Sequence, residues 1–143
     1  MVRSGNQNPA YGSAVETILP FEQAVAKTKD LLKDEGFGVL CEIDIAKTLK
    51  EKIGVQTQPS VILGACNPQL AYRALQEERY LGLLLPCNIV VQERDGKVTV
   101  AAIDVNALLK LTANPSLDEI AGEVQARLAR VLDALKTHVT AAM

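Results

Sequence analysis

Aromatic residues are scarce in this chain of 143 residues, which contains no tryptophan, two phenylalanines and three tyrosines. A buried core must therefore be aliphatic, built from valine, isoleucine, leucine and alanine. The scarcity also removes the ring surfaces on which bases, flavins and sugars stack. Ligand classes that depend on aromatic stacking are disfavoured.

Basic residues are not in excess, and they are scattered along the chain. There are 15 Lys and Arg against 17 Asp and Glu, for a net charge of −2. Nucleic-acid binding requires a basic stripe that displaces counterions, and a lipid-headgroup site requires a basic cluster. The longest apolar run, 81–91, is too short to span a membrane and contains Pro86. We therefore expect neither nucleic acid nor a membrane as a partner.

Cysteine is also rare, with three residues in the whole chain. A small, odd number fits a reducing compartment better than a disulfide framework, which predicts a cytoplasmic protein. The first nine residues are polar and lack the apolar centre of a secretory signal. We interpret residues 1–10 as a flexible N-terminal tail and residues 11–143 as one domain, long enough to bury about two-thirds of its unfolded surface.

The spacing of apolar residues predicts strands and helices in alternation. Strands are expected at 11–18, 37–43 and 60–65, and helices at 20–35, 45–53 and 68–78. Asp44 and Asn67 suit the N-cap position, and Pro68 suits the first position of a helix.

A hairpin and a long helix complete the chain. Strands at 89–94 and 97–103 flank Asp95-Gly96, the pair that type I′ turns prefer, and this places Val91 opposite Val100. A capping box of Ser116 and Glu119 is expected to open a helix that packs on the sheet.

Together these patterns predict one compact α+β domain, with a mixed β-sheet of about five strands and helices packed on one face. The second face of the hairpin is partly apolar, which favours self-association as a homodimer.

Two cysteines lie in mirrored settings, in Cys66-Asn67-Pro68 and in Pro86-Cys87-Asn88. The Cys66 thiol should precede free N–H groups at a helix start, a position that favours the thiolate. Asn67 is explained as the N-cap. Asn88 either pins the turn at 85–87 or faces a ligand beside the thiols. The sequence leaves open whether the Leu85–Pro86 bond is cis.

The remaining candidates for chemistry have simpler interpretations. Cys41 lies within a strand and is expected to pack in the core. His138, the single histidine, follows the last apolar repeat and is expected in solvent near a helix end. Asp44 beside Glu42 reads as a helix cap rather than as half of an acid–base pair, and Asp104 has the same interpretation.

Several motifs together resemble the family catalogued as domain of unknown function 302. They are the two cysteine segments 64–68 and 82–91, the helix start 21–24, the strand entry 35–40 and the segment 71–75. The resemblance covers about residues 20 to 135. It implies a small bacterial or archaeal α+β protein without a settled activity. Val105 stands where members often carry proline after the aspartate.

The leading hypothesis is a non-catalytic domain that binds or senses a small ligand or a metal near Cys66, Asn67, Cys87 and Asn88. Cys66 and Cys87 could hold a soft metal ion, with further ligands supplied by a second copy. One alternative is a thiol-dependent redox enzyme with Cys66 as nucleophile and Cys87 as resolving thiol. Another is a structural homodimeric interaction module. Plain core packing of both thiols also remains open, as do the ligand and the question of catalysis.

Overall fold

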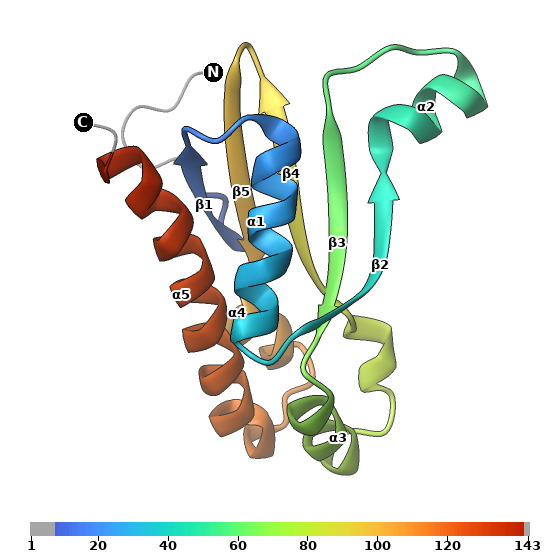
Figure 1. The fold of residues 1–143 in the computed structure, drawn as a ribbon. Coiled ribbons are helices and arrows are strands. Elements are labelled where there is room, and N and C mark those ends of the chain that lie inside the picture. Colours follow the sequence, from blue (N-terminus) through green and yellow to red (C-terminus); the bar gives the residue numbers. More distant parts are fainter. Residues whose placement is uncertain (1–7, 142–143) are drawn as a thin grey trace.

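Five strands form one sheet in the order β1-β5-β4-β3-β2 (Figure 1). The computed structural model describes residues 8–141, with side chains described as far as Lys136. The strands are β1 (Gly12–Thr17), β2 (Gly38–Asp44), β3 (Ser60–Cys66), β4 (Cys87–Arg94) and β5 (Lys97–Ile103).

All four strand pairings are antiparallel. The α+β class and the five-stranded sheet are confirmed, whereas the expectation of a mixed sheet is wrong. The crossover through α1 (Phe21–Asp34) does make β1 and β2 run in the same direction, but they lie at opposite edges with three strands between them. No two parallel strands are therefore neighbours.

Helices α1 and α5 (Asp118–Ala141) cover one face of the sheet (Figure 1). The other helical segments are α2 (Ile45–Ile53), α3 (Pro68–Glu77), α4 (Val105–Lys110) and the 3₁₀ turns η1 (Leu81–Leu84) and η2 (Pro115–Leu117). Asp104 caps α4 by accepting a hydrogen bond from the Ala107 N–H at 3.0 Å, as its capping interpretation predicts. At η2 the cap is Asn114, which accepts from the Ser116 N–H at 3.0 Å. The expected capping box therefore does not open α5, which begins two residues after Ser116.

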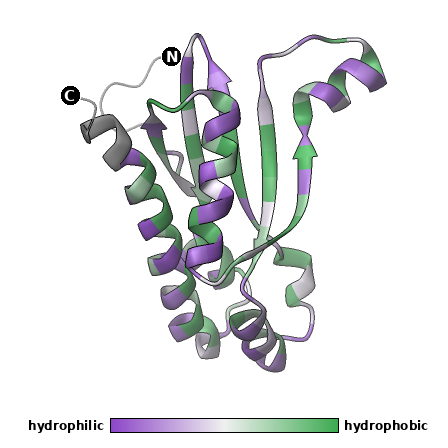
Figure 2. Cartoon of the chain, viewed as in Figure 1, coloured by the Kyte–Doolittle hydropathy of each residue, from purple (hydrophilic) through white to green (hydrophobic). Residues whose placement is uncertain are grey.

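The core between the sheet and these two helices is aliphatic. Val91 and Val100 face each other across the hairpin in the predicted register and are fully buried. Leu32 of α1 and Leu128 of α5 are buried in the same cluster. Hydrophobic residues line the inward sides of both helices (Figure 2). Because aromatic residues are scarce, the core is stabilised by the close packing of aliphatic side chains.

No helix of the described residues covers the opposite face of the sheet, and we call it the open face. Ile62, Val90 and Ile103 lie on it, around a hollow of about 310 Å³. Helix α2 projects from the body beyond the ends of β2 and β3 (Figure 1), and none of its residues is buried. Its Ile45 reaches the rim of the hollow.

The first described residue, Asn8, is tied to β1, because its Oδ1 accepts a hydrogen bond from the Ala14 N–H at 2.7 Å. Of the predicted tail, residues 1–7 lie outside the described residues. His138 belongs to α5, and its side chain also lies outside the described part. Within the described chain, no helix is long and apolar enough to cross a membrane.

Candidate functional site

The two cysteines of the mirrored motifs meet at the end of the sheet where β3 stops and β4 starts. Cys87 pairs with Ala65 in the antiparallel register, so Cys66 is the next residue along β3. Both cysteines line one cavity of about 40 Å³. Its other walls come from α3, η1, α4, α5, strand β3 and the segments that flank these elements. The residues are Phe37, Ala65, Asn67, Leu70, Ala71, Ala74, Leu81, Leu85, Val105, Leu108, Leu109, Ile120 and Val124.

Local sequence signals determine the backbone conformation on either side of Cys66. Asn67 caps α3 as predicted, accepting a hydrogen bond from the Leu70 N–H at 3.1 Å. Pro68 occupies the first helical position, where its missing N–H leaves no donor unsatisfied. On the other strand, a cis Leu85–Pro86 peptide bond leads into Cys87. The prediction of a helix start after Cys66 is confirmed.

The thiols are held protonated, contrary to the expectation for Cys66. Burial raises the pKa of the Cys66 thiol above its ordinary value of 9.0. Burial also raises the pKa of Cys87 to about 11, and the nearby Cys66 adds to the rise. The expected thiolate at the helix start is therefore wrong, because burial of the sulfur favours the neutral thiol.

Cys66 and Cys87 differ in their access to solvent. Cys87 is 7% exposed and lies among buried side chains such as Leu81 and Leu109. Cys66 is half-buried, as are Asn67 and Ala71 beside it. We therefore call the half-buried side of the cavity its mouth and the side at Cys87 its floor.

The other two predicted site residues divide between the faces of the sheet. Asn67 lines the cavity, with its Oδ1 occupied by the α3 cap. Asn88 is exposed and lines the hollow on the open face, because successive strand residues point to opposite sides. The structure thus brings three of the four candidates together and separates Asn88 from the thiols.

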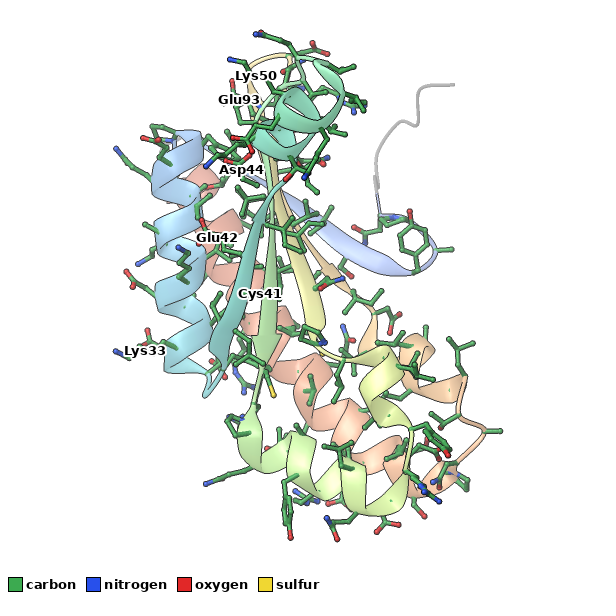
Figure 3. The ribbon with its side chains drawn as sticks, turned by 90° about the vertical axis from the view of Figure 1, so that its right-hand side faces the viewer. Lys33, Cys41, Glu42, Asp44, Lys50 and Glu93 are labelled. Carbon is green, nitrogen blue, oxygen red and sulfur yellow. The ribbon has the colours of Figure 1, made fainter. Side chains whose placement is uncertain are left out.

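Cys41 does not pack in the core, which corrects our expectation. It is exposed on the edge strand β2 (Figure 3), opposite Gly64 of β3. A Cβ added at Gly64 would lie 2.6 Å from Cys41 Sγ and 2.9 Å from Pro86 Cγ. Gly64 therefore leaves the space in which the sulfur and the proline ring sit, on the face opposite Cys87.

An arginine pair fixes the turn before β2, next to the α3 cap. Arg127 Nη1 donates to the Glu35 carbonyl at 2.7 Å, and Arg130 Nη2 donates to the Glu35 carboxylate at 2.9 Å. The hydrogen bonds from Arg130 lower the pKa of Glu35. A Cβ on Gly36, where φ is +86°, would lie 2.9 Å from Asn67 Nδ2. This turn holds α5 beside the cap that positions Cys66.

Sequence reasoning missed the far wall of the cavity. Val105 and Leu109 come from α4, of which only the cap Asp104 was predicted, and Leu81 comes from the 3₁₀ turn η1. A signal for α4 was present, since the cap Asp104 precedes the apolar pattern Val105, Leu108 and Leu109. No local signal indicated that these side chains would face the cysteines.

Within the described residues, no group of three or more His, Cys, Asp or Glu side chains is placed to hold a metal ion. Zinc ordinarily takes four protein ligands in a structural site. A zinc site of that kind therefore cannot be assembled from this chain's described residues.

Comparison with known proteins identifies the chain's relatives. The model of the family described as "Domain of unknown function DUF302" matches residues 13–135. A crystal structure of an uncharacterised conserved DUF302 protein from Bacillus stearothermophilus is similar, with a TM-score of 0.84 and 33% identity. The similarity covers 89% of this chain and 99% of that one. No curated protein matches.

Proposed function

Since this chain belongs to the DUF302 family, whose description names no activity, we propose its function from the geometry of the cavity. It is a non-catalytic binding or sensing domain that takes a small ligand, uncharged in its bound form, between Cys66 and Cys87. One observation carries the proposal: two thiols share a cavity whose lining is almost entirely apolar. The proposal includes a reducing cytoplasmic location, in which both thiols stay free of disulfide bonds.

The physical argument is desolvation. A charged ligand would lose its hydration in a cavity lined by no charged residue, and nothing there would replace the lost interactions. A small apolar species loses little by entering, and apolar cavities in proteins stay dry and bind xenon or benzene. The volume of about 40 Å³ favours a ligand of only a few atoms.

The rival hypothesis of a redox enzyme is less well supported. The thiolate is the reactive form of cysteine, and catalytic cysteines have lowered pKa values. Here burial raises the pKa of both Cys66 and Cys87. We therefore favour binding over nucleophilic attack.

Xenon is a suitable probe for the proposed cavity. We expect it to shift the amide NMR signals of α3, η1 and α4 in the intact reduced protein. Ala71→Leu, which fills the mouth, should abolish these shifts. Ala26→Leu makes the same change at an exposed position of α1 and should leave them intact. Absence of xenon shifts in the unmodified protein would refute the proposal.

A different observation favours a second function, a homodimeric interaction module. Helix α2 projects from the body and carries Ile45, Leu49 and Ile53 without burying any of them. A helix of nine residues is marginally stable in water unless its apolar side is covered. The open face has an apolar hollow of about 310 Å³ on the same chain.

A second copy of this chain is the occupant that these features fit. A two-fold axis would let α2 of each copy approach the open face of the other, as a projection meeting a hollow. None of the residues that line the hollow carries a charge, so the three lysines of α2 would meet no basic group there.

Mass measured in solution tests this second function. Val90→Asp, which places a charge in the hollow, should convert a dimer into a folded monomer. Leu83→Asp changes a leucine that is 85% exposed at the far end of the molecule and should leave the dimer unchanged. A monomeric unmodified protein at high concentration would exclude this function.

A further inference from the structure

The cavity at the end of the sheet contains two sulfur ligands and no charged group. None of its lining residues is Asp, Glu, Lys, Arg or His. The one polar side chain besides the thiols is Asn67, whose Oδ1 already accepts the Leu70 N–H. Apart from this amide, the side chains that line the cavity offer a metal ion two sulfur ligands and no charged oxygen or nitrogen ligand.

Coordination number selects among metals. Zinc, magnesium and calcium require four or more ligands, usually with oxygen or nitrogen among them. Thiolates select soft ions. Soft ions with a filled d shell include some that are satisfied by two sulfurs in a line. The ligand set of this cavity thus fits a soft, two-coordinate ion.

Charge then selects the oxidation state. Two thiolates carry two negative charges, so a divalent ion forms an uncharged complex with them. A monovalent ion such as Cu⁺ would leave one net negative charge in the apolar cavity, where no cationic side chain offsets it. The uncharged complex meets the same requirement as the small ligand proposed above.

We propose that Cys66 and Cys87 together bind a soft divalent cation of the Hg²⁺ type, one ion per chain. The inference deepens the proposed binding function, on which it rests, by naming the ligand class of the same cavity. Two S–H bonds break and two metal–sulfur bonds form, with two protons released to solvent and no change of oxidation state. Cys66 at the mouth receives the ion first, and Cys87 at the floor completes the site.

Cys41 provides an internal comparison. It is exposed on β2, and its sulfur lies over Gly64 on the opposite face of the sheet from Cys87. It would bind a soft ion as a lone thiol does, without a second sulfur from the cavity. A Cys41→Ser variant removes this contribution and leaves the cavity unchanged.

The test uses full-length reduced protein, Hg²⁺ supplied as the chloride, and free cysteine as a competing monothiol. In the Cys41→Ser variant we expect one ion per chain, two protons released per ion, and loss of both remaining thiols from a thiol assay. X-ray absorption should report two sulfur neighbours. Adding Cys66→Ser should weaken binding by at least about 100-fold, since loss of supporting groups alone costs 10- to 100-fold. Thermal unfolding verifies that each variant folds.

Several results would overturn the inference. They are release of one proton per ion, consumption of a single thiol, or unchanged affinity after Cys66→Ser. If xenon binds but Hg²⁺ takes a single thiol, the metal site fails and the cavity function stands. If neither binds in the cavity, both fail. If Hg²⁺ takes both thiols while xenon does not bind, the metal site stands and the apolar-ligand function fails.

Discussion

At the scale of single residues, the two cavity thiols differ because one is at the mouth and the other at the floor. Cys87 is almost fully buried, while Cys66 is half-buried. Both remain protonated near neutral pH because the apolar lining disfavours the thiolate. A neutral thiol is a poor nucleophile, and an ion that binds to both sulfurs must first displace their protons.

Alkylation by iodoacetamide should follow the order Cys41, Cys66, Cys87 in the folded protein. At pH 8 the raised pKa of Cys87, about 11 against 9.0, lowers its thiolate fraction and hence its rate about 100-fold, before access is considered. Mass spectrometry of each cysteine peptide against time gives the rates. Fast modification of Cys66 below pH 8 would instead indicate a reactive thiolate and revive the nucleophile hypothesis.

The raised pKa of Cys87 also predicts that the folded protein loses stability at alkaline pH. The folded pKa of Cys87 lies above the unfolded value, so its contribution is complete below pH 9 and is lost as pH rises toward 11. We expect the free energy of unfolding to fall by about 2 to 3 kcal/mol across this window from Cys87 alone. Urea unfolding at a series of pH values should show that the free energy of unfolding falls more steeply with pH in the parent than in Cys87→Ala between pH 9 and 11. The same dependence of unfolding free energy on pH in both proteins would contradict the raised pKa of Cys87.

Gly64 is constrained by its neighbours rather than by its own dihedral angles. The Cβ of Gly64→Ala would meet Cys41 Sγ at 2.6 Å and Pro86 Cγ at 2.9 Å. We expect the substitution to lower the free energy of unfolding by about 1 to 3 kcal/mol, the range for overpacking. Cys41→Ala combined with it should recover part of that loss, measured as a coupling in a double-mutant cycle. Strict additivity would show that the sulfur is not the obstacle.

At the scale of elements, the capped helices α2 and α3 have unequal importance. Asn67 caps α3, which buries Leu70 and Ala74, whereas Asp44 caps α2, which buries no residue. Asn67→Ala should therefore lower the free energy of global unfolding by about 1 kcal/mol. Asp44→Ala should affect chiefly local opening of α2, detected by hydrogen exchange. Equal effects on global unfolding would mean that α2 belongs to the cooperative core.

At the scale of the whole molecule, one sheet face is covered and the other is open. Figure 3 looks onto the β2 edge, with Cys41, Glu42 and Asp44 along it and α1 to one side. On the covered side Lys29 forms an ion pair with Glu42. The open face and α2 expose apolar side chains that no other described part of the chain covers. The homodimer proposed above would cover them.

Hydrogen exchange of α2 should consequently depend on protein concentration. In dilute solution its amides should exchange quickly, because no side chain of α2 is buried in one copy. At high concentration they should be protected if a second copy covers them, while α5 stays protected throughout. If the amides of α2 exchange equally fast at all concentrations, no second copy covers the helix.

Much of the fold follows from patterns that act over a few residues. The Asp95-Gly96 turn sets the hairpin register, which placed Val91 opposite Val100 correctly. Asn67 and Pro68 located the start of α3. Cys41 was misplaced because an apolar strand pattern does not reveal that β2 lies at an exposed edge. The thiolate expected at Cys66 failed for a similar reason, since burial depends on distant helices.

By itself, the sequence determined the aliphatic core, the order of the strands and of the longer helices, the caps of α2, α3 and α4 and the hairpin register, because hydrophobic periodicity and turn chemistry are local. Only the tertiary structure decided that Cys66 and Cys87 share a cavity and that Asn88 and Cys41 lie on the other face. That outcome depends on α3, α4 and α5 closing over one end of the sheet. Contacts between residues so far apart in the chain leave no local pattern, and they set the desolvation that keeps the thiols neutral.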